Sequence, residues 1–221
     1  MKHFITIILF LILGHQQFWA VDYDLEFARH GYVDIQKMDS TILVNIKYST
    51  TDNFMGINLY GKLNKAFLRP EIARMVVKAQ KLLKAKNSDY SLIIYDAARP
   101  FSVQKTMYNK VKGTKFRRYV ANPYNGGGHH NFGCAVDVSI TYKGKAIDMG
   151  TEFDSFSTLS HIDNENLNLK NGTLSLKAYE NRKLLRSIMK QVGFNTYRRE
   201  WWHFDYYDIK FARENFKILN F

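Results

Sequence analysis

The stretch from Gly126 to Asp137 limits what this chain can fold into more than any other, because it joins a glycine-rich loop to a strand. Three consecutive glycines lead to the adjacent histidines His129 and His130. After Gly133 the residues alternate with a period of two, which is typical of a β-strand. One face of this strand receives Cys134, Val136, Val138 and Ile140, and the other receives Ala135, Asp137 and Ser139. A histidine at the end of the loop and a carboxylate in the strand can therefore converge on one point.

This convergence suits a divalent metal ion, for which His130 offers a nitrogen ligand and Asp137 an oxygen ligand. The best candidate for a third ligand is His203, at the end of Glu200-Trp-Trp-His203. Three protein ligands with an open fourth position are typical of catalytic zinc. Glu200 is then the candidate general base for the attacking water. Arg99, held at a strand end by the following proline, can stabilise a developing oxyanion.

Each of these residues also has a simpler interpretation. Asp137 can be a solvated strand residue, His203 a packed histidine, and the pair His129 and His130 an ordinary surface pair. Residues three apart in a regular strand face opposite sides, so Glu200 and His203 share a site only if Glu200 lies in the turn before the strand or at a bulge. The joint occurrence of all these motifs favours the metal site over coincidence.

The first twenty residues differ in composition from the rest. Lys2 precedes an apolar run from Phe4 to Leu13, and a small residue follows at Ala20. This pattern predicts a secretory signal peptide over residues 1–20, with an uncleaved N-terminal anchor as the alternative. The run is too short to span a bilayer comfortably. We therefore expect an exported protein, periplasmic or secreted, with one domain over residues 21–221 and no stable membrane insertion once the signal is removed.

The net charge of +12 indicates attraction to anionic envelope polymers. The basic residues are scattered, with their densest clusters at Lys115–Arg118 and Tyr197–Arg199. No run resembles a nucleic-acid-binding arm, so a nucleic-acid partner is not expected. Cys134 is the single cysteine, which excludes an intramolecular disulfide. It is expected to pack as a small buried side chain beside the site.

The remaining pattern predicts an α+β fold in a single domain, with a central antiparallel sheet flanked by helices and the zinc site at the sheet. A helix begins at Pro70 and carries an apolar stripe to Leu83. Further helices are predicted over Phe101–Lys112 and Ala178–Val192. Strands are predicted over Thr41–Tyr48, Ser91–Asp96, Gly133–Ile140 and Trp201–Tyr207. Loops are predicted over Thr50–Asn64, Asp148–Asp154 and His161–Gly172.

The motifs resemble those of the zinc D-alanyl-D-alanine dipeptidases, which are related to the metallo DD-carboxypeptidases of cell-wall metabolism. The family pattern Ser-x-His-x-x-Gly-x-Ala-x-Asp is similar to Gly128–Asp137, and its Glu-x-Trp-His is similar to Glu200–His203. The resemblance extends from about Val33 to Tyr207. One departure is Gly128, which stands where the family has a serine that can contact the substrate, so the dipeptide preference can differ.

The resemblance implies a role for each matching residue. It implies that one zinc ion is held by His130, Asp137 and His203, that Glu200 is the base, and that Arg99 matches the family's arginine before proline. It also implies that Asp154, in the segment from Met149 to Asp154, binds the substrate ammonium, and that Tyr48 is a second contact at that end. A free dipeptide carries one positive and one negative end. In this set Glu200 supplies the base, and Arg99 and Asp154 supply one positive and one negative group for these ends.

The implied function is zinc-dependent hydrolysis of D-Ala-D-Ala in cell-wall peptide metabolism, with peptidoglycan fragments as further partners. One alternative is a DD-carboxypeptidase that trims longer stem peptides, and another is a non-catalytic wall-binding module. A serine mechanism could start from Ser102-x-x-Lys105 or Ser187-x-x-Lys190, but the companion Lys-Thr-Gly and Ser-Asp-Asn motifs are absent.

Overall fold

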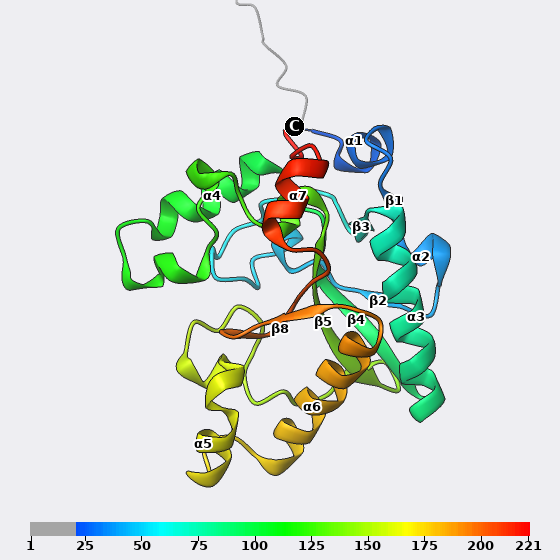
Figure 1. Ribbon diagram of the computed structural model, residues 1–221, viewed down its shortest axis with the longest axis vertical. Helices are drawn as coiled ribbons and strands as arrows, with labels where there is room; N and C mark the ends of the chain where they lie inside the picture. Colours follow the sequence, from blue (N-terminus) through cyan, green and yellow to red (C-terminus); the bar gives the residue numbers. More distant parts are fainter. Residues whose placement is uncertain (1–20) are drawn as a thin grey trace, which may run out of the picture.

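The computed structural model describes residues 21–221, and the predicted signal peptide lies outside the described residues (Figure 1). The centre of the fold is a six-stranded sheet with the order β2-β4-β5-β8-β7, and β6 pairs with β5. Its strands are β2 (Leu43–Val44), β4 (Tyr90–Asp96), β5 (Ala135–Tyr142), β6 (Lys145–Ala146), β7 (Asn195–Tyr197) and β8 (Glu200–Asp205). A separate antiparallel pair joins β1 (Val33–Asp34) to β3 (Phe67–Leu68).

The predicted α+β fold with a central antiparallel sheet is confirmed. The pairs β4–β5, β5–β6, β5–β8 and β7–β8 are all antiparallel. The edge pair β2–β4 is parallel, which the sequence analysis did not predict. Helix α3 (Pro70–Lys86) lies between β2 and β4 in the chain. A parallel pair needs such a crossover connection, because a tight hairpin can join only antiparallel strands.

Two long helices, α3 and α6 (Leu176–Gln191), pack against each other and against the sheet (Figure 1). The predicted helix from Pro70 is confirmed, with Pro70 at its first turn, where the missing N–H is not needed. Its apolar stripe is buried at Ile72, Val76, Ala79 and Leu83. Helix α4 (Phe101–Val111) lies away from this pair, at the end of the sheet where β4 leaves it (Figure 1). The predicted helices at Phe101–Lys112 and Ala178–Val192 are therefore present, with small shifts at their ends.

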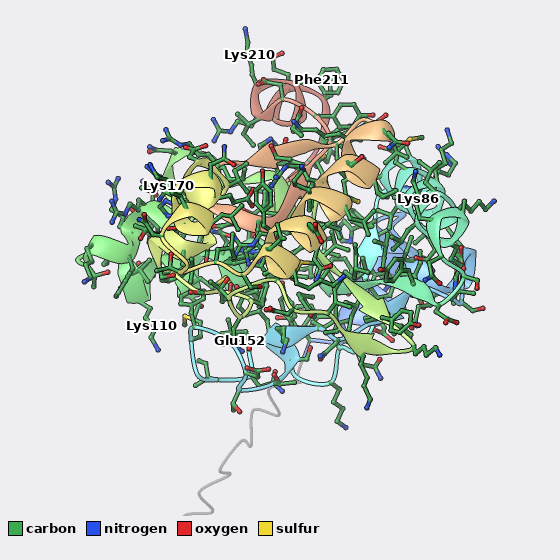
Figure 2. The ribbon with its side chains drawn as sticks, turned by 90° about the horizontal axis from the view of Figure 1, so that it is seen from below. Lys86, Lys110, Glu152, Lys170, Lys210 and Phe211 are labelled. Atoms are coloured by element: carbon green, nitrogen blue, oxygen red, sulfur yellow. The ribbon has the colours of Figure 1, made fainter. Side chains whose placement is uncertain are left out.

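Several short elements complete the described chain. The short α-helices are α1 (Tyr23–Arg29), α2 (Ile35–Met38), α5 (Glu165–Lys170) and α7 (Ile209–Asn215). Short 3₁₀ turns occupy Lys47–Ser49, Lys115–Tyr119, Pro123–Asn125, His129–Phe132, Thr158–Ser160 and Ile162–Asn164. None of the helices formed by residues 21–221 is both long and apolar enough to cross a bilayer. The lysines labelled in Figure 2 point outward on different sides of the molecule, consistent with scattered positive charge.

Two local predictions are wrong. The strand predicted over Thr41–Tyr48 is reduced to β2, and the chain turns at Tyr48, whose carbonyl accepts hydrogen bonds from the N–H groups of Leu59 and Tyr60. The loop predicted over His161–Gly172 contains α5, whose first residue, Glu165, is buried. Glu165 forms ion pairs with Arg182 and Arg186 of α6. Long-range contacts determine the secondary structure of both segments. Such contacts cannot be predicted from the local sequence.

The residues after α7 are tied to the middle of the chain. Leu219 donates its N–H to the carbonyl of Asn131 at 2.9 Å, and its own carbonyl accepts from the N–H of Phe101 at 2.6 Å. The Ser102 hydroxyl donates to the carbonyl of Phe221 at 3.0 Å. This final stretch therefore bridges the start of α4 and the 3₁₀ turn His129–Phe132, which leads into β5.

Candidate active site

Three elements bring His130, Asp137 and His203 together. His130 lies in the 3₁₀ turn before β5, and Asp137 and His203 are directly paired across β5 and β8. Gly133, between the turn and the strand, has a φ of +66°, and a Cβ there would lie 2.2 Å from the Tyr32 ring. Only glycine fits both the left-handed backbone and the space at that point.

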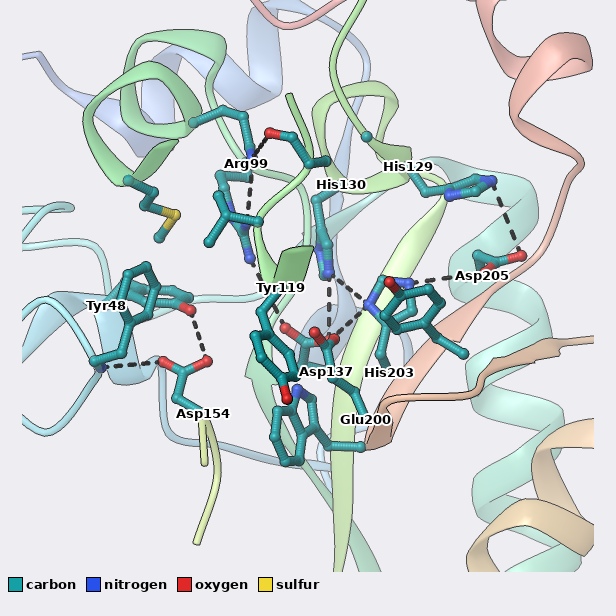
Figure 3. A pocket seen from close by; sticks show the side chains of 18 of the residues that line it. Tyr48, Arg99, Tyr119, His129, His130, Asp137, Asp154, Glu200, His203 and Asp205 are labelled. Atoms are coloured by element: carbon teal, nitrogen blue, oxygen red, sulfur yellow. Dashed lines mark hydrogen bonds and ion pairs between the residues drawn. The ribbon is translucent and has the colours of Figure 1, made fainter. Parts of the chain in front are cut away.

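The donor atoms of these three residues are spaced for one metal ion (Figure 3). His130 Nε2 lies 3.2 Å from His203 Nδ1 and 3.3 Å from Asp137 Oδ1, and His203 Nδ1 lies 3.1 Å from the same oxygen. Ligands bonded at about 2.0–2.2 Å in a tetrahedral arrangement lie roughly 3.3–3.6 Å apart. Two imidazoles and one carboxylate in this spacing can hold a divalent metal with an open position.

The surroundings of the group fix its protonation. His130 Nδ1 lies 2.6 Å from the carbonyl oxygen of Ala97, which can only accept, so Nδ1 carries a proton and in the neutral ring Nε2 presents its lone pair. Burial tends to raise the pKa of Asp137, but His130 and His203 outweigh it and hold that pKa well below its usual range. Asp137 is therefore ionised, as a metal ligand must be.

Glu200 is the first residue of β8, and the β7–β8 register shifts between Thr196 and Tyr197, directly opposite it. The irregularity allows Glu200 and His203 to line the same pocket although they are three residues apart. Burial, followed by the charges of Asp137 and Asp154, raises the pKa of Glu200 well above its usual value. A carboxylate with a raised pKa can both accept and return a proton near neutral pH.

Asp154 lies at another side of the pocket, where Tyr48 donates a hydrogen bond to its Oδ1 at 2.9 Å and the N–H of Phe54 lies 3.4 Å from its Oδ2 (Figure 3). The residue adopts a left-handed backbone with a φ of +59°, which aspartate tolerates better than most side chains. Burial raises the pKa of Asp154 to about 7. This partly buried carboxylate has no cation within ion-pair distance among residues 21–221.

Arg99 is buried, and its guanidinium is held by protein groups. Nε and Nη2 donate to the carboxylate of Asp96 at 2.9 and 2.5 Å, and Nη1 donates to Gln104 Oε1 at 3.0 Å. Its Nη2 lies 3.8 Å from Asp137 Oδ2. Two of its five N–H groups remain for the pocket. Since Asp96 neutralises its charge, Arg99 offers fixed donors more than a free cation.

All seven residues singled out in the sequence line one cavity of about 240 Å³. These residues are Tyr48, Arg99, His130, Asp137, Asp154, Glu200 and His203. Ser102 and Ser187, which would start a serine mechanism, are not among its lining residues.

The chain matches the family described as D-ala-D-ala dipeptidase over residues 28–220. It belongs to that family. This family membership makes the chain an enzyme of the dipeptidase type and confirms the resemblance seen in the motifs.

Curated relatives support the assignment. A D-alanyl-D-alanine dipeptidase of Enterococcus faecium is 28% identical over 196 residues, which cover 79% of this chain and 90% of that protein. A D-alanyl-D-alanine dipeptidase of Escherichia coli (strain K12) is 28% identical over 174 residues, which cover 78% of this chain and 83% of that protein. A solved vancomycin resistance D,D-pentapeptidase in complex with Zn(II) is 18% identical, with a TM-score of 0.37 over 68% of this chain and 79% of that chain. That structural similarity is too low to support an inference.

Other pocket residues of this family member were not singled out from the sequence. Arg118 and Tyr119, from the 3₁₀ turn Lys115–Tyr119, form part of the wall, and Tyr119 stacks on Phe156 with ring centroids 4.7 Å apart. Phe156 in turn packs on Phe54 at 4.9 Å. The basic cluster at Lys115–Arg118 was the only signal in the sequence for this wall. It did not indicate whether these side chains face the pocket.

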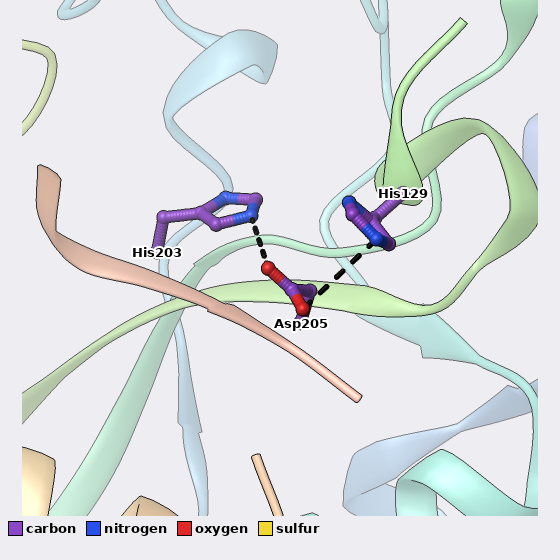
Figure 4. Close-up of side chains that lie close together, drawn as sticks. All are labelled: His129, His203 and Asp205. Carbon is purple, nitrogen blue, oxygen red and sulfur yellow. Dashed lines mark ion pairs between the residues drawn. The ribbon is translucent and has the colours of Figure 1, made fainter. Parts of the chain in front are cut away.

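In this dipeptidase-family chain, His129, the neighbour of His130, belongs to a different cluster of side chains. His129, His203 and Asp205 form a second cluster with spacing suited to a metal (Figure 4). The Asp205 carboxylate lies 3.9 Å from His129 Nε2 and 3.7 Å from His203 Nε2. Burial lowers the pKa of His129. Asp205 lies in the strand predicted over Trp201–Tyr207, but the sequence pattern gave it no role in metal binding, so this cluster is a finding of the structure.

Proposed function

We propose that the protein is a zinc-dependent hydrolase of D-Ala-D-Ala, with the metal held by His130, Asp137 and His203. The observation that carries the proposal is the spacing of their donor atoms, at 3.1–3.3 Å, in a pocket that also contains Glu200. A mixed nitrogen and oxygen donor set suits zinc, which accepts imidazole and carboxylate ligands without a preferred geometry. Zinc would supply Lewis acidity that lowers the pKa of water from about 15.7 to about 7.

The protein's own groups then perform the proton transfers and position the substrate. Glu200 accepts a proton from the attacking water and later returns it to the leaving amine, for which its raised pKa is suited. The remaining N–H groups of Arg99, which lines the pocket, would stabilise the oxygen on which negative charge develops. These donors are already fixed by Asp96 and Gln104, so they need little reorganisation during the reaction.

Support for a free dipeptide, rather than a long stem peptide, comes from the wall around Asp154. Tyr48 and Phe54 contact this carboxylate directly, and the rings of Phe54, Phe156 and Tyr119 continue the wall. A free ammonium would pair with Asp154, whereas a peptide extended at its amino end would have to pass this wall. We infer that dipeptides are preferred, and that trimming of longer wall peptides is the alternative to be tested.

Activity on free D-Ala-D-Ala is expected to exceed activity on N-acetyl-D-Ala-D-Ala and on a wall pentapeptide by a wide margin. L-Ala-L-Ala tests the stereochemical preference in the same assay, and a chelator tests the metal requirement. Equal rates on the free and acetylated dipeptides would contradict a dipeptidase and favour a carboxypeptidase. Turnover that survives complete metal removal would contradict the hydrolase mechanism as a whole.

Asp154→Asn is expected to raise KM for D-Ala-D-Ala by roughly 10- to 150-fold with a smaller effect on kcat. The reason is that a hydrogen bond to a charged group contributes about 1.5–3 kcal/mol. With a pKa of about 7 in the free protein, Asp154 loses its proton as pH rises through that value. The KM of the parent for the free dipeptide should therefore fall over that range, and the variant should lose this part of the pH dependence, while the part due to Glu200 remains in both proteins.

The control for this variant is Glu152→Gln, which changes an exposed carboxylate two residues earlier, outside the pocket (Figure 2). Its KM and its pH profile should match those of the parent. An Asp154→Asn variant with unchanged KM for the free dipeptide would show that another group receives the ammonium.

The substrate carboxylate needs a different partner, because the charge of Arg99 is already matched by Asp96. Arg118 also lines the pocket, and among residues 21–221 no carboxylate lies within ion-pair distance of it. Its guanidinium lies over the Tyr119 ring, 5.5 Å from the centroid. We therefore assign the substrate carboxylate to Arg118.

Arg118→Ala is expected to raise KM several-fold, in line with the 0.2–1 kcal/mol that is typical of an exposed ion pair, or about 1.4- to 5-fold. Added salt should reduce the difference between parent and variant, because exposed charges are screened. Arg117→Ala is the matched control, since Arg117 binds the Tyr108 hydroxyl at 3.0 Å and does not line the pocket. The same KM change in both variants would point to general electrostatic attraction instead of a contact with Arg118.

We further propose that the protein acts outside the cytoplasm, on peptides derived from the cell wall. The support is the basic start and apolar run predicted as a signal peptide over residues 1–20. Fractionation of the native host, with N-terminal sequencing of the mature protein, tests both the location and the cleavage point. A cytoplasmic protein that retains residues 1–20 would contradict this proposal and leave the chemistry of the pocket untouched.

A further inference from the structure

His129 has a buried ring nitrogen without a partner. Its Nε2 is buried and has no hydrogen-bond partner among residues 21–221. In the neutral tautomer that carries its proton on Nδ1, Nε2 presents a lone pair.

In that tautomer the lone pair of His129 faces another acceptor. Asp205 Oδ1 lies 3.9 Å from His129 Nε2 and also accepts a hydrogen bond from Asn195 Nδ2 at 3.2 Å. Two acceptors that face each other without a donor between them are an unfavourable arrangement, and a buried unpaired nitrogen has a desolvation cost. A group that carries positive charge or donates hydrogen bonds to both atoms would relieve this arrangement (the two side chains are drawn in Figure 4).

His129 repeats the arrangement of the neighbouring His130. Each ring directs its Nε2 toward an aspartate, Asp137 for His130 and Asp205 for His129. The two groups lie on opposite sides of the His203 ring, with Nδ1 toward Asp137 and Nε2 toward Asp205.

We propose that His129 Nε2 and Asp205 Oδ1 form a second, weaker site for a divalent cation, separate from the one held by His130, Asp137 and His203. Two bonds of about 2.1 Å can span up to about 4.2 Å, so the 3.9 Å separation fits one bound cation. Water completes the coordination, since His203 Nε2 keeps its proton when Nδ1 holds the first metal. Two protein ligands and a nearby first cation make the second site the weaker one.

Occupancy of the second site acts on the first through Asp205. This inference rests on the proposed function at one point, namely that His203 binds the first metal through Nδ1. The proton on Nε2 then points toward Asp205 Oδ2, 3.7 Å away, which orients the ring. A cation bound to Asp205 competes for this carboxylate and repels the first cation. Excess zinc is therefore expected to inhibit the enzyme reversibly.

The test is a zinc titration of the purified full chain by equilibrium dialysis, with activity measured in parallel. The parent should bind one zinc tightly and a second only at higher free zinc, with activity falling as the second binds. His129→Ala and Asp205→Asn should each retain the tight zinc and lose the second. In His129→Ala the activity that remains should no longer fall at the zinc concentrations that inhibit the parent.

A matched control separates this site from adventitious binding. His30 and Glu26 form another histidine–carboxylate pair, at 4.0 Å, but on the surface. His30→Ala should leave both zinc equivalents unchanged. A parent that binds only one zinc at millimolar concentrations, or a second zinc that persists in His129→Ala, would overturn the inference and indicate water between the two acceptors. Failure of the parent to bind the first zinc would instead contradict the proposed function.

Discussion

Glu200→Gln is expected to lower kcat by about 10²- to 10⁴-fold or more. This range is typical of general acid–base catalysis. Glutamine keeps the shape and hydrogen-bonding capacity of the side chain but cannot take the proton from the attacking water. Since Glu200 is not one of the three proposed ligands, the variant should retain its zinc. Metal analysis, substrate binding by calorimetry and steady-state kinetics on D-Ala-D-Ala measure the three properties separately.

Two results would change the assignment of Glu200. Activity within a few-fold of the parent would mean that another group accepts the proton. Loss of zinc together with loss of activity would make Glu200 a ligand, and the set of three donor atoms would have to be redrawn. Retained zinc with retained substrate affinity and lost turnover is the only combination that supports a base.

His203→Ala is expected to reduce the zinc content from about one per chain to near zero and to abolish turnover. The remaining His130 and Asp137 would leave a two-ligand site, which falls short of the three protein ligands of catalytic zinc. His129→Ala is the informative comparison, because it removes the adjacent histidine and should keep the tight zinc. Metal analysis after dialysis against zinc-free buffer compares the two variants.

Full zinc occupancy in His203→Ala would contradict the ligand set. Loss of the tight zinc in His129→Ala would mean that the wrong member of the histidine pair was chosen. A folding defect is recognised by circular dichroism, and His203→Asn provides a smaller change if the alanine variant does not fold. Because zinc binds the folded state, loss of the metal should also lower the melting temperature of the protein.

The positions of the pocket residues could be predicted where local pattern determines direction. The alternation after Gly133 placed Asp137 on one face of a strand, and the structure pairs that residue directly with His203. Sequence alone could not show how Glu200 joins them, because the answer depends on a register shift in β7 and β8. Such a register shift arises from the pairing of two strands, so it cannot be predicted from the sequence of either strand alone.

The parts that sequence analysis missed depend on contacts between distant residues. Glu165 begins a helix because Arg186 and Arg182, on α6, neutralise its buried charge. Arg118 reaches the pocket because the 3₁₀ turn that follows α4 folds over it. The cluster of His129 and Asp205 depends on the register of β5 and β8. In each case the residue type was visible in the sequence and its partner was not.

The hydrogen bonds of Leu219 have a consequence for the order in which the protein is completed during synthesis. The carbonyl of Asn131, in the turn that carries His130, receives its partner only when Leu219 has been made. Closing so long a loop has an entropic cost, and contacts between distant residues form slowly. Nearly all of the described chain is therefore synthesised before this last hydrogen bond to the turn can form. His203, the third proposed ligand, is also made late, so we expect metal uptake to follow the synthesis of most of the described chain.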